Sequence, residues 1–570
     1  MRRIVVGVLA TIGAVALLLA AGGFAAAWLL LGETPQLPGQ MILTLDLREE
    51  VPEMHGGEPL GALGLPQSPT LIEVTMALEA AGRDSRVKGL LARLDGEGPG
   101  LAQAQELRSA LAAFRDRGKF AYAHADSFGE FGPGTVGYYL ATAFDEIHLQ
   151  PLGGLGLTGI LIETPLLRGL LDNLGIDPAG GKRGAYKHGA DIFTDSTLSP
   201  EHRESLESLA DSLDAQIKSG IAEGRGMAVA DVARLVDRGP YVAEEGQMAG
   251  LVDGLSYWRE VTEQARDRAG AGSQLVSLED YIGAIEAPPD DAPVVGLVRG
   301  VGQIQRGNSD HGPTGGWIMG ADTVAHALAD AIDDPEVAAI LFRIDSGGGS
   351  AVASETIGRE VRRAVEQGKP VIVSMGTAAA SGGYWIAMDA SQIVADPGTL
   401  TGSIGVFAGK PVLTEFWGEI GVNWGQVARG ANATMWSTLQ DYDRRGRARL
   451  DAFLDQVYAA FTDGVARGRG LSRDQVLEIA QGRVWTGQQA KEIGLVDELG
   501  GFTRALAVTR EAIGVAPDRA VELRAFPPPL DLWDQALELL GAPPGWIDAV
   551  GPWLQLLRPG MLSAPPIVVR

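Results

Sequence analysis

The sequence predicts an α/β protein in which one domain occurs twice in tandem behind an apolar N-terminal segment. Three observations predict this arrangement. Short apolar runs alternate with amphipathic helical patterns, two long stretches of the chain align with each other, and residues 4–32 carry no charged side chain. Strand–helix alternation of this kind is typical of parallel sheets joined by right-handed βαβ crossovers.

The apolar N-terminal segment predicts a membrane anchor. About 20 apolar residues cross the roughly 30 Å hydrocarbon core, and residues 4–32 exceed that length. Arg2 and Arg3 precede the segment, so the positive-inside rule places the N-terminus in the cytoplasm and the remainder outside. A cleavable signal peptide is the alternative, although its apolar region is usually about 7–15 residues long. We therefore expect a single-pass membrane protein with its domains on the extracytoplasmic side, which is the periplasm if the cell is Gram-negative.

Three pairs of motifs reveal the internal repeat. VKGLLARLDG matches VAAILFRIDS, GTVGYYLA matches ASGGYWIA, and GLVDGL matches GLVDEL. The first pair places Arg93 on Arg343. Self-similarity on this scale predicts a duplicated structural unit. The predicted divisions are a stub, anchor and short linker at 1–39, a first repeat at 40–270, a linker at 271–289, a second repeat at 290–510, and a Pro/Trp-rich tail at 511–570.

Each copy is predicted to contain buried parallel strands and covering helices. In the second copy, residues 292–300, 338–345 and 369–375 are short, largely apolar runs of the kind found in such strands. Residues 321–332 and 354–368 show helical patterns. The tail contains the amphipathic pieces LDLWDQALELL and WLQLL. We expect these pieces to pack on the domain or to form an oligomer contact, with binding to a membrane surface as the alternative.

The composition excludes several kinds of site. The chain of 570 residues has no cysteine, which excludes disulfides, a cysteine nucleophile and cysteine-ligated metals. Its seven histidines are scattered without HExxH or similar spacing, so we expect no metal and no cofactor. The net charge of −25 argues against nucleic acid as a partner, because phosphate binding needs clustered Lys and Arg.

A glycine run follows a predicted strand in the second copy, within DSGGGS at 345–350. Glycines allow a sharp turn that exposes backbone N–H groups, and such groups can form part of an oxyanion hole. A phosphate-binding loop is one alternative, but neither GxxxxGK[ST] nor GxGxxG fits here. A purely structural turn is the other alternative.

Ser381 lies between Ala380 and Gly382 at a predicted strand-to-helix junction, where small neighbours leave room for a substrate carbonyl. A helix-capping serine is the more common explanation for this pattern. A nucleophilic serine needs a base, and no histidine follows Ser381, because the last one is His326. A Ser-His-Asp order is therefore excluded. Carboxylates are too weakly basic at neutral pH, which leaves a lysine made neutral by burial.

Several motifs resemble the signal peptide peptidase A family of the ClpP/crotonase superfamily, in its long, tandem-repeat form. They are AASGGYW at 379–385, TGSIG at 401–405 and TGQQA at 486–490, and the resemblance covers about 40–510 together with the anchor. RGAYKHGADIF resembles the segment that bears the family's general-base lysine. The resemblance thus implies ClpP/crotonase-like repeats, a Ser–Lys dyad of Ser381 and Lys187, and no metal or cofactor.

The resemblance also implies oxyanion donors, Gly382 together with Gly348 or Gly349. One departure is visible, because Asp345-Ser346-Gly347 stands where the family more often has Asn-Ser-Pro. Backbone N–H groups are the useful groups in this loop, so we expect little effect on catalysis.

The repeat alignment supports a composite site. Thr135 stands at the position equivalent to Ser381, and Ala433 at the position equivalent to Lys187. The first copy therefore has the lysine without the serine, and the second has the serine without the lysine. Because a short connection usually joins neighbouring elements, we expect the pair to meet within one chain. The alternative is that both copies have drifted and Lys187 is a surface lysine.

The resemblance implies a membrane-anchored serine endopeptidase that degrades released signal peptides and other peptides through an acyl-enzyme, as a homotetramer. Two other classes of function are open at this point. Crotonase relatives act on acyl-CoA, although such an enzyme would have little use for an anchor. A non-catalytic membrane scaffold is the second, although the intact Ser381, Lys187 and glycine loop argue against it.

Overall fold

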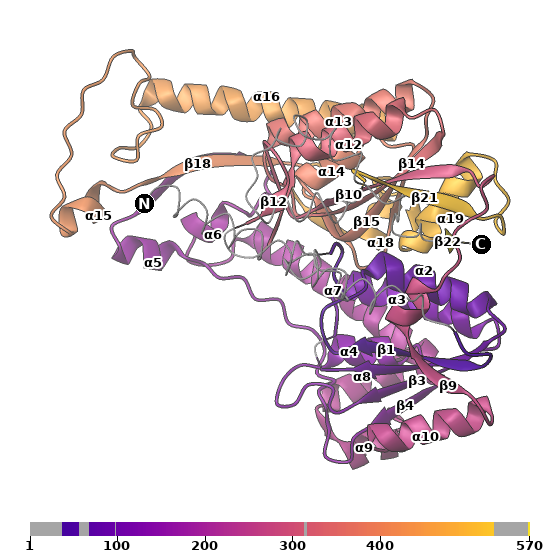
Figure 1. The fold of residues 1–570 in the computed structure, drawn as a ribbon. Helices are drawn as coiled ribbons and strands as arrows, with labels where there is room; N and C mark the ends of the chain where they lie inside the picture. The colour runs from indigo at the N-terminus through magenta and orange to yellow at the C-terminus, as the bar shows by residue number, and fades with distance from the viewer. Residues whose placement is uncertain (1–36, 56–67, 97, 313–315, 529–567, 570) are drawn as a thin grey trace, which may run out of the picture.

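The computed structural model describes residues 37–55, 68–96, 98–312, 316–528 and 568–569. They form two lobes, each with a sheet and helices, and an arm that projects from the lobes (Figure 1). The predicted anchor at 4–32 and the two amphipathic pieces of the tail lie outside the described residues. Of the helices that are described, none combines the length and the apolar character needed to cross a bilayer.

The first lobe contains a six-stranded sheet in the order β8-β4-β3-β2-β1-β9, and every pair of neighbours is parallel. Its strands are β1 (Met41–Leu47), β2 (Val87–Leu94), β3 (Phe120–Ala125), β4 (Glu146–Leu149), β8 (Gly254–Leu255) and β9 (Gln274–Ser277). The other elements of this copy are α2 (Leu71–Arg83), α3 (Leu101–Arg115), α4 (Thr135–Ala141), β5 (Gly154–Leu155), α5 (Arg168–Asn173), β6 (Asp177–Arg183), α6 (Asp191–Thr194), α7 (Pro200–Arg225), α8 (Val229–Arg238), β7 (Tyr241–Val242), α9 (Ala243–Met248), α10 (Trp258–Ala269) and α11 (Leu278–Gly283).

The second lobe repeats this topology. Its sheet contains the run β20-β16-β15-β14-β10-β21, again with parallel neighbours throughout. These strands are β10 (Val294–Val301), β14 (Val337–Ser346), β15 (Val371–Ala380), β16 (Gln392–Ala395), β20 (Glu498–Leu499) and β21 (Val521–Phe526). Additional strands are β11 (Gln303–Gln305), β12 (Asp310–His311), β13 (Trp317–Gly320), β17 (Leu400–Gly402), β18 (Val406–Val412), β19 (Val484–Thr486) and β22 (Val568–Val569). The helices are α12 (Ala321–Asp333), α13 (Ala351–Glu366), α14 (Gly382–Ala387), α15 (Thr414–Glu419), α16 (Arg444–Arg469), α17 (Arg473–Ile479), α18 (Gly487–Glu492) and α19 (Phe502–Ala512).

The matching strand orders agree with the duplication expected from the motifs, but the divisions expected from the sequence need correction. β9 and α11 fall within the stretch that we assigned to a linker, 271–289, and β21 falls within the stretch that we assigned to a tail, 511–570. Each of these strands pairs with the first strand of its own copy and completes that sheet. A short edge strand such as β9 gives a weak sequence signal, because none of its four residues is fully buried.

The two long helices of the copies, α7 and α16, have clear local signals at both ends. Ser199 caps α7 and Pro200 opens its first turn, while Asp443 caps α16. Both side chains accept a hydrogen bond from an N–H of the first turn, which is the usual N-cap arrangement. Gly226 and Gly470 end the helices in the left-handed conformation that glycine adopts without steric cost.

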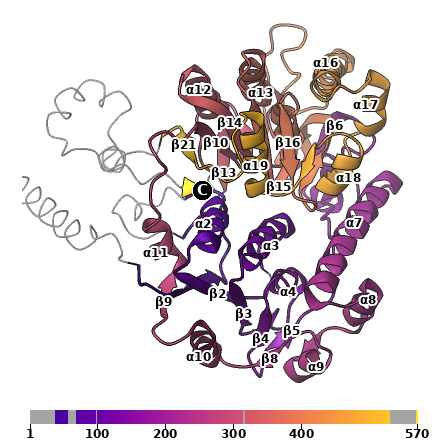
Figure 2. The ribbon, with the colours of Figure 1, turned by 90° about the vertical axis from the view of Figure 1, so that its right-hand side faces the viewer.

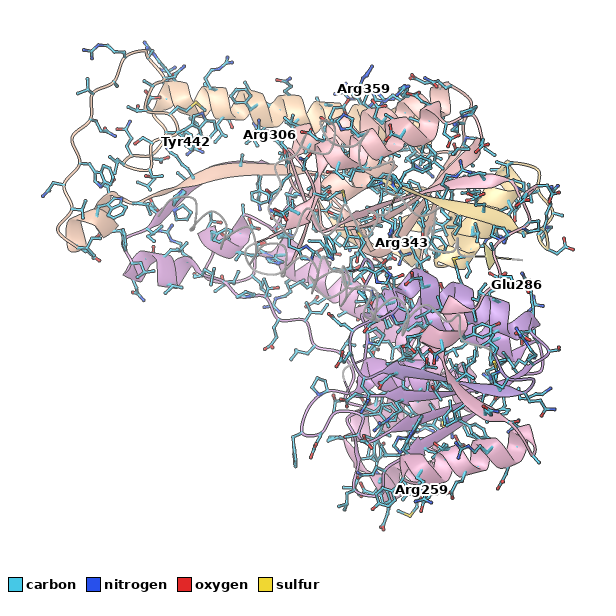
Figure 3. All side chains as sticks on the ribbon, in the orientation of Figure 1. Arg259, Glu286, Arg306, Arg343, Arg359 and Tyr442 are labelled. Carbon is cyan, nitrogen blue, oxygen red and sulfur yellow. The ribbon has the colours of Figure 1, made fainter. Side chains whose placement is uncertain are left out.

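A buried ionic cluster joins the lobes. α2 and α3 of the first copy face the second lobe (Figure 2), and Arg343 of β14 lies between the lobes (Figure 3). Its guanidinium donates to Glu53 at 2.8 and 2.9 Å and to Glu106 at 2.9 Å. All three side chains are almost fully buried. Because unpaired charges are costly away from water, this cluster fixes the position of one copy against the other.

A ribbon shared by the copies forms part of the arm. β6 of the first copy pairs antiparallel with β18 of the second along all seven of its residues (Figure 1). Arg183, at the end of β6, forms ion pairs with Asp455 at 2.6 Å and Asp451 at 3.2 Å on α16. The ribbon carries the segment that follows β6 across to the second lobe.

Candidate active site

Lys187 and Ser381 meet within one chain. Lys187 follows β6, and the N–H of its neighbour Tyr186 donates to the carbonyl of Gln481 in the second copy at 2.8 Å. This places Lys187 Nζ 2.9 Å from Ser381 Oγ. Lys187 is only 5% exposed, so the alternative of a surface lysine does not hold.

Ser381 joins β15 to α14 in an uncommon backbone conformation. Its φ is +53° and its ψ is −113°, a region that residues other than glycine rarely adopt and that is costly unless the surroundings enforce it. The Ser381 N–H donates to the carbonyl of Gly402 at 2.8 Å. Its side chain makes no capping hydrogen bond to α14. The helix-capping explanation is therefore wrong, and the hydroxyl is left to face Lys187.

A second serine, Ser403, completes the surroundings of the lysine. The carbonyl oxygen and Oγ of Ser403 each lie 2.8 Å from Lys187 Nζ. Like Ser381, Ser403 has a positive φ, +52°. The sequence patterns assign this residue no role of its own. Its only signal there was its place within the TGSIG motif.

Burial controls the charge of the lysine. It lowers the pKa of Lys187 to about 8, because a charged ammonium is disfavoured away from water. The three oxygen atoms that surround Nζ belong to two hydroxyls and a carbonyl, all uncharged. A substantial neutral fraction of this lysine is therefore available close to physiological pH.

The glycine loop after β14 packs directly on Ser381. Gly348 has a φ of +109°, and a Cβ there would lie 2.7 Å from Gly382 N and 2.8 Å from Ser381 Cβ. The Gly348 N–H donates to Ser346 Oγ at 3.1 Å. Within the described part of the chain, the N–H groups of Gly349 and Gly382 donate to no acceptor. A Cβ on Gly382 would lie 3.1 Å from Gly349 N. The geometry therefore favours Gly349 over Gly348 as the partner of Gly382.

Asp345 ties this loop to the strand that carries the serine. Its Oδ1 accepts a hydrogen bond from Ala378 N in β15 at 2.9 Å. Burial, reinforced by the nearby negative charge of Glu53, raises the pKa of Asp345 to about 6. The Asp345 carboxyl thus accepts a hydrogen bond from the backbone. It is not among the hydrogen-bond partners of Lys187 Nζ, which are Ser381 and Ser403.

The equivalent positions of the opposite copies hold no second pair. Thr135 is buried, and its Oγ1 donates to the carbonyl of Gly159 at 2.8 Å. Ala433 is exposed in the loop between α15 and α16. The structure thus agrees with a single composite site drawn from both copies. Among the described residues, one group of side chains lies close enough together to hold a metal ion, His188, Asp191 and His202, and no spacing motif in the sequence indicated it.

Comparison with known proteins identifies the family. The profile of peptidase family S49 matches residues 114–272 and 363–516, more than half of the chain. Protease 4 of Haemophilus influenzae is 31% identical over 84% of this chain and 78% of its own length. Serine protease SPPA, chloroplastic, of Arabidopsis thaliana is 29% identical over 85% of this chain and 70% of its own length. Protease 4 of Salmonella typhi is 31% identical over 78% of this chain and 72% of its own length.

Among solved structures, a mutant of ClpP1 from Listeria monocytogenes aligns with 37% of this chain and 94% of its own. The sequence identity is 17% and the TM-score is 0.24, which is too low to assign a fold. The family match and these three relatives confirm the resemblance to signal peptide peptidase A. With both repeats matched by one profile, the chain belongs to peptidase family S49 and is a serine peptidase.

Proposed function

We propose that Ser381 is the nucleophile of this peptidase and Lys187 its general base. The observation that carries the proposal is the 2.9 Å contact between Ser381 Oγ and a buried lysine amine. A neutral amine has two hydrogens and one lone pair. The hydrogens are accounted for by the carbonyl and Oγ of Ser403, which leaves the lone pair for the hydroxyl proton of Ser381. This is the arrangement that an activated serine requires.

The reaction then follows from the positions of these groups. Ser381 Oγ attacks the peptide carbonyl while its proton passes to Lys187 Nζ. The N–H groups of Gly382 and Gly349 stabilise the oxyanion that forms. The C–N bond breaks as Lys187 gives the proton to the leaving amine, and an acyl-enzyme remains. Lys187 next takes a proton from water, whose oxygen attacks the ester, and the proton returns to Ser381 as the acid product leaves.

Substitution of each proposed catalytic residue tests the dyad. Ser381→Ala and Lys187→Met should each lower kcat/KM for a peptide ester by about 10⁴-fold or more, as expected when a nucleophile or its base is removed. Thr135→Ala is the matched control, because Thr135 occupies the equivalent position of the other copy and should leave activity unchanged. A serine-directed covalent probe should label wild type and not Ser381→Ala. Near-normal turnover by Lys187→Met would refute the base assignment.

We further propose that the enzyme is membrane-anchored and degrades released signal peptides. The uncharged segment at 4–32 and the family motifs support this. The full chain should remain in the membrane fraction after carbonate washing, and a chain lacking residues 1–36 should be soluble and active. Synthetic signal peptides should be cleaved, whereas a folded mature domain should not. Hydrolysis of acyl-CoA in preference to peptides would support the crotonase-like alternative, and a folded enzyme without peptidase activity would support the scaffold alternative.

The ClpP/crotonase-like character of each repeat and the homotetramer are part of the same proposal. The parallel strand order shared by both lobes supports the first. Large exposed apolar side chains on the arm support a contact between subunits. Those more than half exposed include Ile420, Trp424, Val427 and Trp436. Light scattering in detergent should give a tetramer for wild type and a smaller species for Trp424→Ser combined with Val427→Ser. A monomeric wild type would contradict it.

A further inference from the structure

Three side chains with metal-binding chemistry converge beside the proposed base. His188 follows Lys187, Asp191 opens α6, and His202 lies in the first turn of α7. One potential ligand atom from each lies within 4.8 Å of the others. His188 Nδ1 is 2.8 Å from Asp191 Oδ2, and the imidazole rings of His188 and His202 stack with centroids 4.1 Å apart.

The cluster is buried and incompletely satisfied. Asp191 and His202 are 4% and 5% exposed. One nitrogen of His188 is used by Asp191, while the other, Nε2, is buried and has no hydrogen-bond partner in the described part of the chain. A buried polar atom without a partner costs free energy. A metal ion coordinated by His188 Nε2 would remove that cost.

Among the residues that the structure describes, Lys182 is the one lysine or arginine that forms an ion pair with the cluster. Its ammonium lies 2.6 and 2.8 Å from the two carboxylate oxygens of Asp191. The Lys182 side chain is one-third exposed, so it can move toward water while it keeps one of the two oxygens. Oδ1, which His188 does not contact, then becomes available to another cation. The stacked rings must also turn, since one ion cannot lie in the planes of two parallel rings 4.1 Å apart.

We propose that His188, Asp191 and His202 form a binding site for a first-row divalent transition-metal ion of the Zn²⁺ class. Two imidazoles and a carboxylate are a common donor set for such ions, and imidazole disfavours Ca²⁺ and Mg²⁺. Water completes the coordination. A bound ion ties the segment that follows β6 to the start of α7, and this segment carries Lys187. The site is separate from the dyad and takes no part in the reaction steps described above.

Metal binding to the full chain in detergent tests this inference. After treatment with a chelator, wild type should bind one Zn²⁺ by calorimetry. Co²⁺ at the same site should give the intense visible absorption of a four- or five-coordinate ion with nitrogen ligands. His202→Ala and Asp191→Ala should each weaken Zn²⁺ binding by about 100-fold or more, since even changes beyond the direct ligands commonly cost 10–100-fold. His326→Ala removes a histidine from the surface of α12 and should bind as wild type does.

A comparison of folded variants makes the outcome decisive. Thermal melts without metal identify which variants are folded, and His202→Gln provides a second variant that keeps the size and polarity of the side chain. Binding in folded His202→Gln that equals wild type would overturn the proposal. A Co²⁺ spectrum of an octahedral, oxygen-ligated ion would also overturn it, because surface carboxylates would then be the ligands. Loss of the signal in His202→Gln with retention in His326→Ala is the result expected.

Discussion

Gly482 lies so close to Lys187 that a side chain at 482 would overlap the backbone of the lysine. A Cβ there would lie 2.7 Å from both Lys187 N and Lys187 Cβ. Backbone atoms cannot turn aside as the end of a flexible side chain can. The second copy therefore shapes the position of the lysine that the first copy supplies.

Replacing this glycine should reduce activity by moving Lys187. Gly482→Ala should lower kcat by about 100-fold, the order of loss expected when a reacting group moves by about 1 Å. Gly470→Ala is the matched control. Gly470 also has a positive φ, +64°, but no atom lies within 4 Å of its Cβ position. Both variants should lose roughly 1–2 kcal/mol of stability through backbone strain. Equal activities for the two would show that the Gly482 contact does not position the base.

The pH dependence of hydrolysis should report the titration of Lys187. Burial lowers the pKa of Lys187 to about 8, and in the proposed mechanism the neutral amine is the base. At pH 7 the Lys187 amine is neutral in about one-tenth of the molecules, since one pH unit changes the ratio of neutral to charged lysine tenfold. The rate on a non-titrating substrate should rise up to about pH 8 and then level. A rate that is flat through neutral pH and falls only near pH 4 would indicate a carboxylate base.

The same pKa shift predicts how stability depends on pH. The folded state has a lowered pKa, so between about pH 8 and the ordinary lysine value of 10.5 the unfolded chain binds the extra proton. Stability contributed by this group therefore rises with pH across that window, and the full penalty applies below pH 8. At pH 7 the free energy of unfolding of Lys187→Met should exceed that of wild type by up to about 3 kcal/mol. Loss of the lysine's hydrogen bonds reduces this gain. Denaturant melts should show a smaller stability difference between Lys187→Met and wild type at pH 10 than at pH 7. A difference that grew with pH would contradict the lowered pKa of Lys187.

Catalytic residues on different chains should not complement one another. When Ser381→Ala and Lys187→Met chains are co-expressed and mixed oligomers are purified, every site formed within one chain lacks one of the two groups. Activity should remain at background. A sizeable return of activity in verified mixed oligomers would show that Lys187 of one chain serves Ser381 of another.

The buried ionic cluster of Arg343 should contribute far more to stability than the ion pair of Arg93, the aligned arginine of the first copy. Arg343→Met leaves Glu53 and Glu106 buried without their cation and should cost about 3–5 kcal/mol in the free energy of unfolding. Arg93→Met is the control from the aligned position. Its partner Asp126 is half exposed, and pairs of that kind contribute about 0–1 kcal/mol. Similar losses for the two variants would mean that the cluster does not hold the lobes together.

The sequence could predict the parts of this structure that depend on local pattern. Buried strands such as β14 are largely apolar runs, and the paired motifs predicted that one unit occurs twice. The ribbon of β6 and β18 could not be predicted in this way. DPAGGKR in β6 contains a proline and two glycines and shows no alternation of apolar residues, because Ala179 is its one fully buried residue.

Site residues divide along the same line. Ser381 and Lys187 lie in distinctive motifs. The absence of a histidine after Ser381 indicated a lysine base, and the resemblance to the signal peptide peptidase A family implied that this lysine is Lys187. Ser403 acts through its carbonyl and hydroxyl in a positive-φ conformation, which no residue pattern reveals. The unused N–H groups of Gly349 and Gly382 likewise depend on backbone geometry. His188 and His202 lie on opposite sides of α6 in the sequence, and only the folded chain brings their rings together.

The ribbon of β6 and β18 has a consequence for how the enzyme responds to dilution. Were its two strands on separate chains, formation of the Lys187–Ser381 pair would follow an association equilibrium and fail at low concentration. Covalent linkage of the copies makes the pairing intramolecular, at an effective concentration that the linker and interface set. Assembly of each site should therefore be first order in protein, so a single molecule carries a complete Lys187–Ser381 pair however dilute the protein is.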